Sequence, residues 1–265
     1  FCFDTETTGI DALTAQLVGL SFSTEKGKAW YIPLSNDREK CTAELALFQP
    51  LWSSSQVKIG QNIKYDLQVL HQYGYSVQAP FFDTMLAHYL LEPDQRHSMD
   101  RLSEQYLGYS PISIETLIGK KGKNQGSMQD VPLDKITPYA CEDADVTLQL
   151  KQVFDPMLKE KSVNAVFHDI EIPLVEVLRT MEEAGVAIDI PALHEFSDLL
   201  FQMAADAEKE IYQLAGTKFN IASPKQLGDV LFQLMQLDPK AKKTATGQYK
   251  TDEEVLQRLA DQGHE

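Results

Sequence analysis

The stretch FCFDTET at residues 1–7 decides the fold, because an apolar strand ends there in two acids. Side chains two positions apart on a strand point to the same face, so the carboxylates of Asp4 and Glu6 converge. Acids are depleted in strands, and two on one face repel each other unless a positive charge lies between them. The pair therefore indicates a divalent cation. The alternative is a frayed strand end whose acids face water.

The segments after this strand complete an α/β pattern. Apolar, β-branched and aromatic residues at 15–24 and 28–34 predict two more strands, which form an antiparallel meander with the first. A short strand at 57–59 is predicted, with helices at 43–52, 66–73, 84–91, 99–107 and 138–154. From residue 165 onward the periodicity is almost wholly helical. The sequence thus predicts an α/β domain with a mixed, helix-flanked central sheet, followed by an all-α segment.

Composition narrows the class of protein. With 265 residues, 43% of them hydrophobic, the chain has material for one large or two smaller cores, and no apolar run is long enough for a membrane span. Three cysteines without metal-type spacing fit reduced thiols in a cytoplasm. The net charge of −15 argues against tight, nonspecific duplex binding by this chain alone. Because Phe1 begins within a strand and no initiator Met precedes it, we expect a piece of a longer protein.

A second group of polar residues lies on the predicted helix at 138–154. Tyr139 and Asp143 are four positions apart and share a face, whereas Asp145 points elsewhere and is expected to be solvated. Pro138 is expected in the first turn of this helix. Asp66 follows a short strand, and by itself it is equally typical of an acid at a helix N-terminus. The six histidines have no metal-ligand spacing.

Three motifs, FDTETTG at 3–9, GQNIKYDLQVL at 60–70 and YACEDADVTLQL at 139–150, carry a family resemblance. In this order they resemble the motifs of the DEDDy 3′-5′ exonucleases, specifically the proofreading domain of bacterial, Klenow-type family A DNA polymerases. Residues 83–102 extend the resemblance, and 170–189, 219–232 and 242–256 are similar to the start of the polymerase domain and its thumb. The resemblance implies a ribonuclease H-like exonuclease domain at 1–160 and a truncated helical thumb at 161–265, without a polymerase active site.

The same resemblance implies the chemistry. Its catalytic residues would be Asp4, Glu6, Asp66, Tyr139 and Asp143. All four acids would bind metal, with Asp4 bridging two cations, and oxygen ligands favour Mg²⁺ or Mn²⁺, although Zn²⁺ is compatible. The implied reaction is two-metal hydrolysis of a phosphodiester. Tyr139 and Glu6 would orient the attacking water, because a phenol that titrates near pH 10 is a poor base at neutral pH.

Residues beside the motifs are implied to hold the DNA strand end: Thr7, Ile10, Gln61, Asn62, Tyr65, Arg96 and Ile114. Ile114 stands where the family often has an aromatic residue, so stacking worth roughly 1–3 kcal/mol per base is weakened. The polar loop at 119–126 is either a solvated surface loop or a phosphate contact. Lys242 and Lys243, in a basic loop, are either solvated or grip duplex DNA phosphates.

We therefore expect a cytoplasmic, nucleoid-associated nuclease of DNA replication and repair that removes 3′-terminal nucleotides from single-stranded or frayed DNA. Its partners would be DNA and the remainder of a polymerase chain, and it would be a monomer without membrane contact. One alternative is an RNase D-like exoribonuclease, against which the thumb-like sequence after residue 165 argues. The other is a catalytically silent scaffold, against which the presence of all four carboxylates and the tyrosine argues.

Overall fold

A computed structural model describes residues 1–264, which form two compact units, 1–185 and 186–264. The main elements of the first unit are β1 (Cys2–Thr7), β2 (Leu17–Glu25), β3 (Lys28–Pro33), α1 (Arg38–Leu45), α2 (Gln49–Trp52), β4 (Lys58–Gly60), α3 (Ile63–Gln72), β5 (Phe81–Asp83), α4 (Thr84–Leu91), α5 (Met99–Leu102), η2 (Ser103–Leu107), α6 (Glu115–Ile118), η3 (Met128–Asp130), α7 (Leu133–Glu160), α8 (Asn164–Val166), η4 (Phe167–Glu171) and α9 (Ile172–Ala184). Each helix of the described residues is too short or too polar to span a bilayer.

The five strands form one mixed sheet in the order β3-β2-β1-β4-β5. β1 pairs with β2 and β2 with β3 in antiparallel register, whereas β1–β4 and β4–β5 are parallel. This confirms the predicted α/β class and the antiparallel meander. β1 thus lies at the centre of the sheet, where a neighbour on each side fixes its register.

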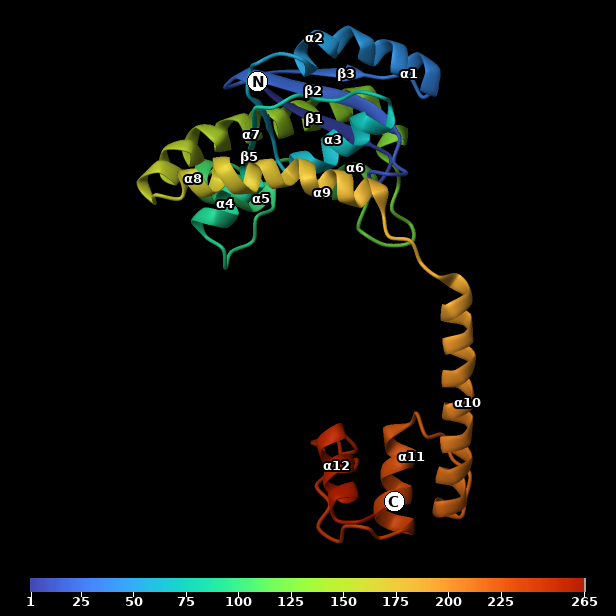
Figure 1. The fold of residues 1–265 in the computed structure, drawn as a ribbon. Helices are drawn as coiled ribbons and strands as arrows, with labels where there is room; N and C mark the ends of the chain where they lie inside the picture. The colour runs from blue at the N-terminus through green and yellow to red at the C-terminus, as the bar shows by residue number, and fades with distance from the viewer. Residues whose placement is uncertain (265) are drawn as a thin grey trace. The chain divides into compact units, whose positions relative to one another are not determined.

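Helices cover both faces of the sheet, with α1 and α2 on one side and α7 on the other (Figure 1). Alternation along β1 sends Phe3 toward α2, where its ring lies 5.2 Å from that of Trp52. Phe22 of β2 stacks on the same indole at 5.9 Å, and all three rings are buried. The opposite face of β1, which carries the acids, meets α7. The aromatic core therefore fixes which side of the strand the acids occupy.

Helix α7 is longer than the sequence predicted. It starts at Leu133, so Pro138 lies inside it, and the prediction that this proline occupies the first turn was wrong. A proline in a helix interior removes one backbone hydrogen bond and is costly. The turn before it is held by Ile136, which packs with Val18 and Met128 in a small apolar cluster. Tertiary packing therefore extends the helix where local propensity would end it.

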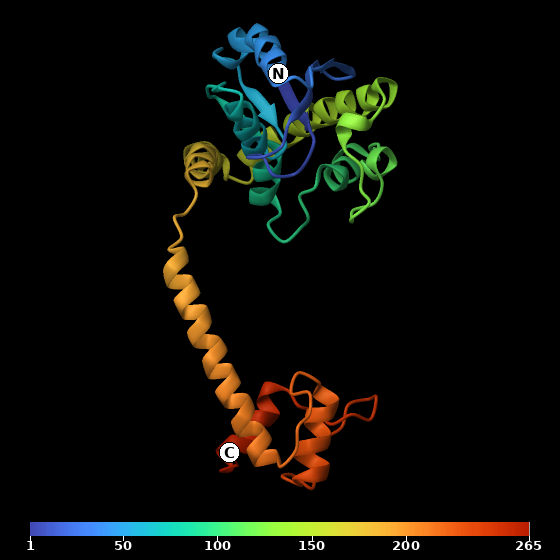
Figure 2. The ribbon, with the colours of Figure 1, turned by 90° about the vertical axis from the view of Figure 1, so that its right-hand side faces the viewer.

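The second unit is helical, with α10 (Ile190–Ala215), α11 (Pro224–Asp229), η5 (Val230–Leu234) and α12 (Glu253–Asp261). Within it, η5 packs on α10, and Figure 2 shows α11 beside the C-terminal half of that helix. Ser223 caps α11 as predicted, and Gly216 ends α10 in a left-handed conformation. Helix α9 belongs to the first unit, where it packs on α3. The assignment of 1–160 and 161–265 as functional domains stays a prediction.

One buried carboxylate joins the short parallel strands to the helices that follow them. Asp83, at the end of β5, is 2% exposed. It accepts hydrogen bonds from the amides of Met85 and Leu86 at the start of α4, and from those of Asn62 and Ile63 at the start of α3. Asn62 has a left-handed backbone and no side-chain cap of its own. Asp83 therefore caps two helices at once and fixes the first turn of α3.

We predict that Asp83→Ala lowers the free energy of unfolding of the first unit by about 1–4 kcal/mol, because two N-caps worth about 0.5–2 kcal/mol each are lost. Urea unfolding followed by tryptophan fluorescence measures the loss, because both tryptophans, Trp30 and Trp52, lie in the first unit. Asp37→Ala is the matched control, because Asp37 is an exposed cap that accepts one amide hydrogen bond, from Lys40. Equal losses for the two variants would contradict the double-cap role.

Candidate active site

Two acids of the site come from β1. Asp4 is paired in register with Ser21 of β2, and Glu6 with Gly19. A Cβ at Gly19 would lie 2.2 Å from the Tyr31 hydroxyl oxygen, so only glycine lets that ring lie beside Glu6. The ladder shifts register just after Glu6. Pairing with β2 holds Asp4 and Glu6 in register, and the shift that follows them places both carboxylates at the end of the regular part of the strand.

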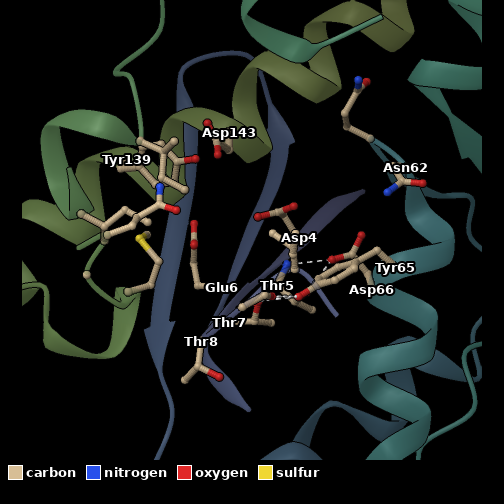
Figure 3. Close-up of a pocket in the computed structure, with 18 of the residues that line it drawn as sticks. Asp4, Thr5, Glu6, Thr7, Thr8, Asn62, Tyr65, Asp66, Tyr139 and Asp143 are labelled. Atoms are coloured by element: carbon tan, nitrogen blue, oxygen red, sulfur yellow. Dashed lines mark hydrogen bonds between the residues drawn. The ribbon is translucent and has the colours of Figure 1, made fainter. Parts of the chain in front are cut away.

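The third acid comes from α7. Ligand oxygens of Asp4, Glu6 and Asp143 lie within 4.8 Å of one another. Figure 3 shows the three carboxylates pointing toward a common space. Glu6 is 6% exposed and Asp143 8%. Within residues 1–264, Glu6 Oε1 and Asp143 Oδ1 are buried and accept no hydrogen bond. Buried polar atoms are normally satisfied, so these two oxygens call for a partner that the chain itself does not supply.

Asp66 lies on the other side of Asp4, on the first turn of α3 (Figure 3). Its Oδ1 accepts hydrogen bonds from the Thr5 amide at 3.0 Å and the Thr5 hydroxyl at 2.6 Å. The amide is available because β4 pairs with β1 only at Cys2, short of this position. The end of the short parallel ladder therefore provides the donor that holds Asp66 beside Asp4.

Burial dominates the electrostatics of the four acids. It raises the pKa of Asp4 to about 7. It also raises the pKa values of Glu6, Asp66 and Asp143, and the charge of Asp4 raises each of them further. None of the ion pairs formed within the described residues includes any of these acids. The group is therefore short of positive charge.

The donor set fits hard divalent cations. It offers carboxylate oxygens only, two of which are fully buried without a hydrogen bond, and this chemistry suits Mg²⁺ or Mn²⁺. Asp4, Glu6 and Asp143 could hold one ion, and Asp66 lies outside that set but next to Asp4. The use of Asp4 between two cations stays a prediction.

Tyr139 lies one helical turn before Asp143 and is half-buried. Burial raises its phenol pKa, and the charges of Asp143, Glu6 and Asp4 raise it further. The hydroxyl therefore stays protonated at neutral pH and can donate or accept a hydrogen bond. This holds for the metal-free site, and the role of Tyr139 in orienting a water stays a prediction.

Comparison with known proteins assigns the family. Residues 1–159 match the family model described as 3′-5′ exonuclease. The chain belongs to this exonuclease family. Residues 190–265 match the model described as DNA polymerase family A. This confirms the family that the three motifs predicted.

Relatives of this exonuclease are DNA polymerases I from many bacteria. The Pseudomonas aeruginosa protein is 41% identical over 277 residues, covering 99% of this chain and 30% of the relative. The Bacillus subtilis protein is 30% identical, covering 92% and 27%. The chain thus spans less than a third of the length of these relatives.

Solved structures confirm the fold. The structure titled "POL domain of Pol1 from M. smegmatis complex with DNA primer-template and dNTP" matches with a TM-score of 0.75 at 26% identity, covering 99% of this chain and 42% of that one. Brucella melitensis NrnC, solved with bound Mg²⁺, matches with a TM-score of 0.55 at 21% identity, covering 71% and 88%. The first unit of the exonuclease has the predicted ribonuclease H-like fold.

Most of the predicted substrate-contact residues line one cavity, of about 610 Å³, together with the acids. These are Thr7, Ile10, Gln61, Asn62, Tyr65 and Ile114. The Thr7 and Tyr65 hydroxyls hydrogen-bond to each other at 2.6 Å, and both lie within hydrogen-bonding distance of the Gly9 carbonyl, which fixes the turn after β1. Ile10, just beyond it, is 91% exposed. Their contacts with a substrate stay predictions.

Other predicted contacts are placed differently. Gln61 donates to the His97 carbonyl at 2.7 Å and accepts from Thr84, so its amide is already engaged. Arg96 is exposed and does not line the cavity. Lys242 and Lys243 belong to the second unit, where the Lys243 ammonium lies 4.4 Å from the Tyr249 ring centroid. Lys243 therefore packs against an aromatic residue of its own unit.

Sequence reasoning missed residues that shape the cavity from a distance. Glu142 accepts hydrogen bonds from the Tyr109 hydroxyl and the Ile112 amide, and so ties the segment before Ile114 to α7. The loop at 119–126 contributes Lys121, Gln125 and Gly126 to the wall. The basic, glycine-punctuated sequence of this loop indicated a possible phosphate contact, but the sequence pattern did not show which of its lysines lines the cavity.

We predict that the metal-free protein becomes more stable as pH falls from about 8 to 5. With a pKa of about 7, folded Asp4 binds a proton in this window, whereas the unfolded residue titrates near 3.9. The folded state then binds more protons, so stability decreases with rising pH, by at most about 1.4 kcal/mol per pH unit for each such group. Thermal unfolding in EDTA across this range measures it.

Asp4→Asn is the control and should flatten this slope. Mn²⁺ should stabilise the protein more at pH 8 than at pH 6, because metal binding requires deprotonated carboxylates. A slope that is the same in the wild type and in Asp4→Asn would rule out this titration.

Proposed function

We propose that the chain is a DEDDy-type 3′-5′ exodeoxyribonuclease that removes 3′-terminal nucleotides from single-stranded or frayed DNA by two-metal-ion hydrolysis. The observation that carries the proposal is the convergence of Asp4, Glu6 and Asp143 with two buried oxygens that no group of residues 1–264 satisfies. A scaffold without catalytic function would gain nothing from this unfavourable burial of charge. Divalent cations bound there would supply a nucleophilic water and neutralise charge that develops on the phosphate.

The chain's own groups prepare the site for this reaction. Thr5 fixes one oxygen of Asp66 with two hydrogen bonds, which leaves its other oxygen for a ligand. Tyr139 keeps its proton and lies beside Asp143, so its hydroxyl can hold a water at the carboxylate cluster. Preorganised groups of this kind lower the reorganisation needed at the moment of reaction.

The cavity supports a strand end rather than a duplex. Apolar side chains of Ile10, Ile114, Ile118 and Met128 line it together with the acids. Bases need such apolar walls once they are unstacked, and a terminal nucleotide of a single strand is the part of DNA that can enter. We propose DNA over RNA because the relatives are DNA polymerases.

The remainder of a polymerase chain is the partner that we propose. Helix α10 begins the part that matches DNA polymerase family A, and it exposes a row of apolar side chains: Leu193, Phe196, Leu199, Leu200, Phe201 and Met203. Exposed apolar area of this extent marks an interaction surface. Hydrogen exchange along α10 should slow when the rest of the polymerase is present, and unchanged exchange would contradict the proposal.

The experiment that tests the function follows a 5′-labelled single strand of DNA and an RNA of the same sequence with Mg²⁺, Mn²⁺ or EDTA. We expect a ladder that shortens from the 3′ end of the DNA, only with metal. Faster shortening of the RNA would favour the RNase D-like alternative. No shortening of either strand would favour the silent scaffold.

We predict that Asp143→Asn lowers the rate of DNA hydrolysis by at least about a hundredfold, because a contribution of several kcal/mol from bound metal is lost. Asp145→Asn is the matched control on the same helix. Asp145 accepts hydrogen bonds from the Gly27 amide and from Gln149, and it does not line the cavity. Initial rates at saturating Mg²⁺ compare the two, and equal rates would remove Asp143 from the site.

We predict a smaller loss, of about fivefold in kcat, for Tyr139→Phe, because one hydrogen bond worth about 1 kcal/mol is removed and no metal ligand is lost. Tyr89→Phe, at an exposed tyrosine outside the cavity, is the control. The measurement is kcat against pH from 6 to 9. A pH dependence of kcat that the wild type shows and the variant loses would indicate that the phenol is a base, and it would contradict the positioning role.

A further inference from the structure

Lys121 is the one basic side chain among the described residues that line the cavity of the acids. It lies in the loop at 119–126, whose other two lysines, Lys120 and Lys123, do not line this space. Within residues 1–264 it makes no ion pair. Its charge is therefore available to a ligand in the cavity, although four acids line the same space.

The loop is anchored at its base. Gly126 donates its amide to the Ile118 carbonyl at 2.8 Å, and Gln125 donates to the Gly119 carbonyl at 3.3 Å, which closes the loop. Ile118 packs on the apolar cluster of Val18, Met128 and Ile136, and Tyr139 packs on the same cluster. The loop and the catalytic end of α7 therefore share one support. Because the two ends of the loop are anchored, Lys121 is held on the wall of the cavity that the acids also line.

The charges in and around the cavity indicate a role for Lys121. Two divalent cations would balance the charge of the four acids alone, so the phosphodiester next to the scissile one would carry a negative charge that these cations do not balance. A cavity lined by acids would repel that group. Lys121 lines the same cavity as these acids but forms no ion pair with any of them within residues 1–264, so its ammonium is free to bind a phosphate of a strand that enters the cavity.

We propose that Lys121 binds the phosphodiester adjacent to the scissile one on its 5′ side, so that it positions the strand and takes no part in the chemical step. The inference rests on the proposed nuclease function, because it requires the 3′ end of a strand in this cavity. The proposal gives Lys121 the role of phosphate contact at this site. Such a contact needs a positive charge, and the chain as a whole has a net charge of −15.

The test is a binding cycle with the chain in an Asp143→Asn background, so that the strand is not degraded. Fluorescence anisotropy compares a single-stranded oligonucleotide with one whose penultimate linkage is an uncharged methylphosphonate. We expect Lys121→Gln to weaken binding of the first about three- to tenfold, and to lower the slope of log affinity against log salt by about 0.7, the value for one phosphate contact in single strands. The methylphosphonate strand should bind both proteins equally.

Lys120→Gln and Lys123→Gln are matched controls with the same change of net charge, and Lys121→Arg should retain most of the affinity. An equal loss in all three glutamine variants would show a diffuse attraction and overturn the proposal. So would a loss in Lys121→Gln that persists with the methylphosphonate strand.

Kinetics separate this inference from the proposed function. In the active chain, Lys121→Gln should raise KM for single-stranded DNA and leave kcat within about twofold, because uniform binding alone is lost. A fall in kcat with unchanged KM would place Lys121 at the scissile phosphate and contradict the proposal. If the wild type hydrolyses no DNA, the nuclease function fails, and the binding cycle still decides whether Lys121 contacts the phosphate.

Discussion

The repulsion among buried carboxylates at the end of β1 is the constraint on which the rest of the first unit depends. Asp4, Glu6 and Asp143 bring their oxygens within 4.8 Å, and burial raises the pKa of each. Such a group pushes its own members apart. It stays together only if each acid is attached to an element that cannot move away. A central strand and a 28-residue helix packed across the sheet meet that requirement.

The scaffold holds these acids with neutral donors rather than with cations. Asp66 is fixed by the amide and hydroxyl of Thr5, and the helix that carries it is capped by Asp83 through backbone amides. A lysine or arginine at either place would fix the geometry equally well, but it would also neutralise the site. Neutral anchors preserve the deficit of positive charge that makes the site attractive to a divalent cation.

Whether the sequence could predict a contact depended on how far apart the two residues lie along the chain. Asp4 with Glu6, and Tyr139 with Asp143, are related by the periods of a strand and a helix, so local pattern placed each pair on one face. Asp66 meets Thr5 across 61 positions, and only its motif pointed to the site. Pro138 was misplaced because Ile136 packs on residues distant in sequence. Arg96 follows a family motif, yet its segment runs outside the cavity.

The net charge of −15 and a nucleic-acid substrate are compatible for a structural reason. A protein that holds duplex DNA by its phosphates needs an extended basic face, because each contact contributes little and many are required. A site that takes one strand end needs charge only where the end lies, and divalent cations supply most of it. Such a site would then need only a few contacts along the entering strand and apolar walls such as Ile114 and Ile118. Under the proposed function the cavity would select unpaired ends, since a stacked and paired terminus would offer neither its bases to those walls nor its last phosphate to the acids.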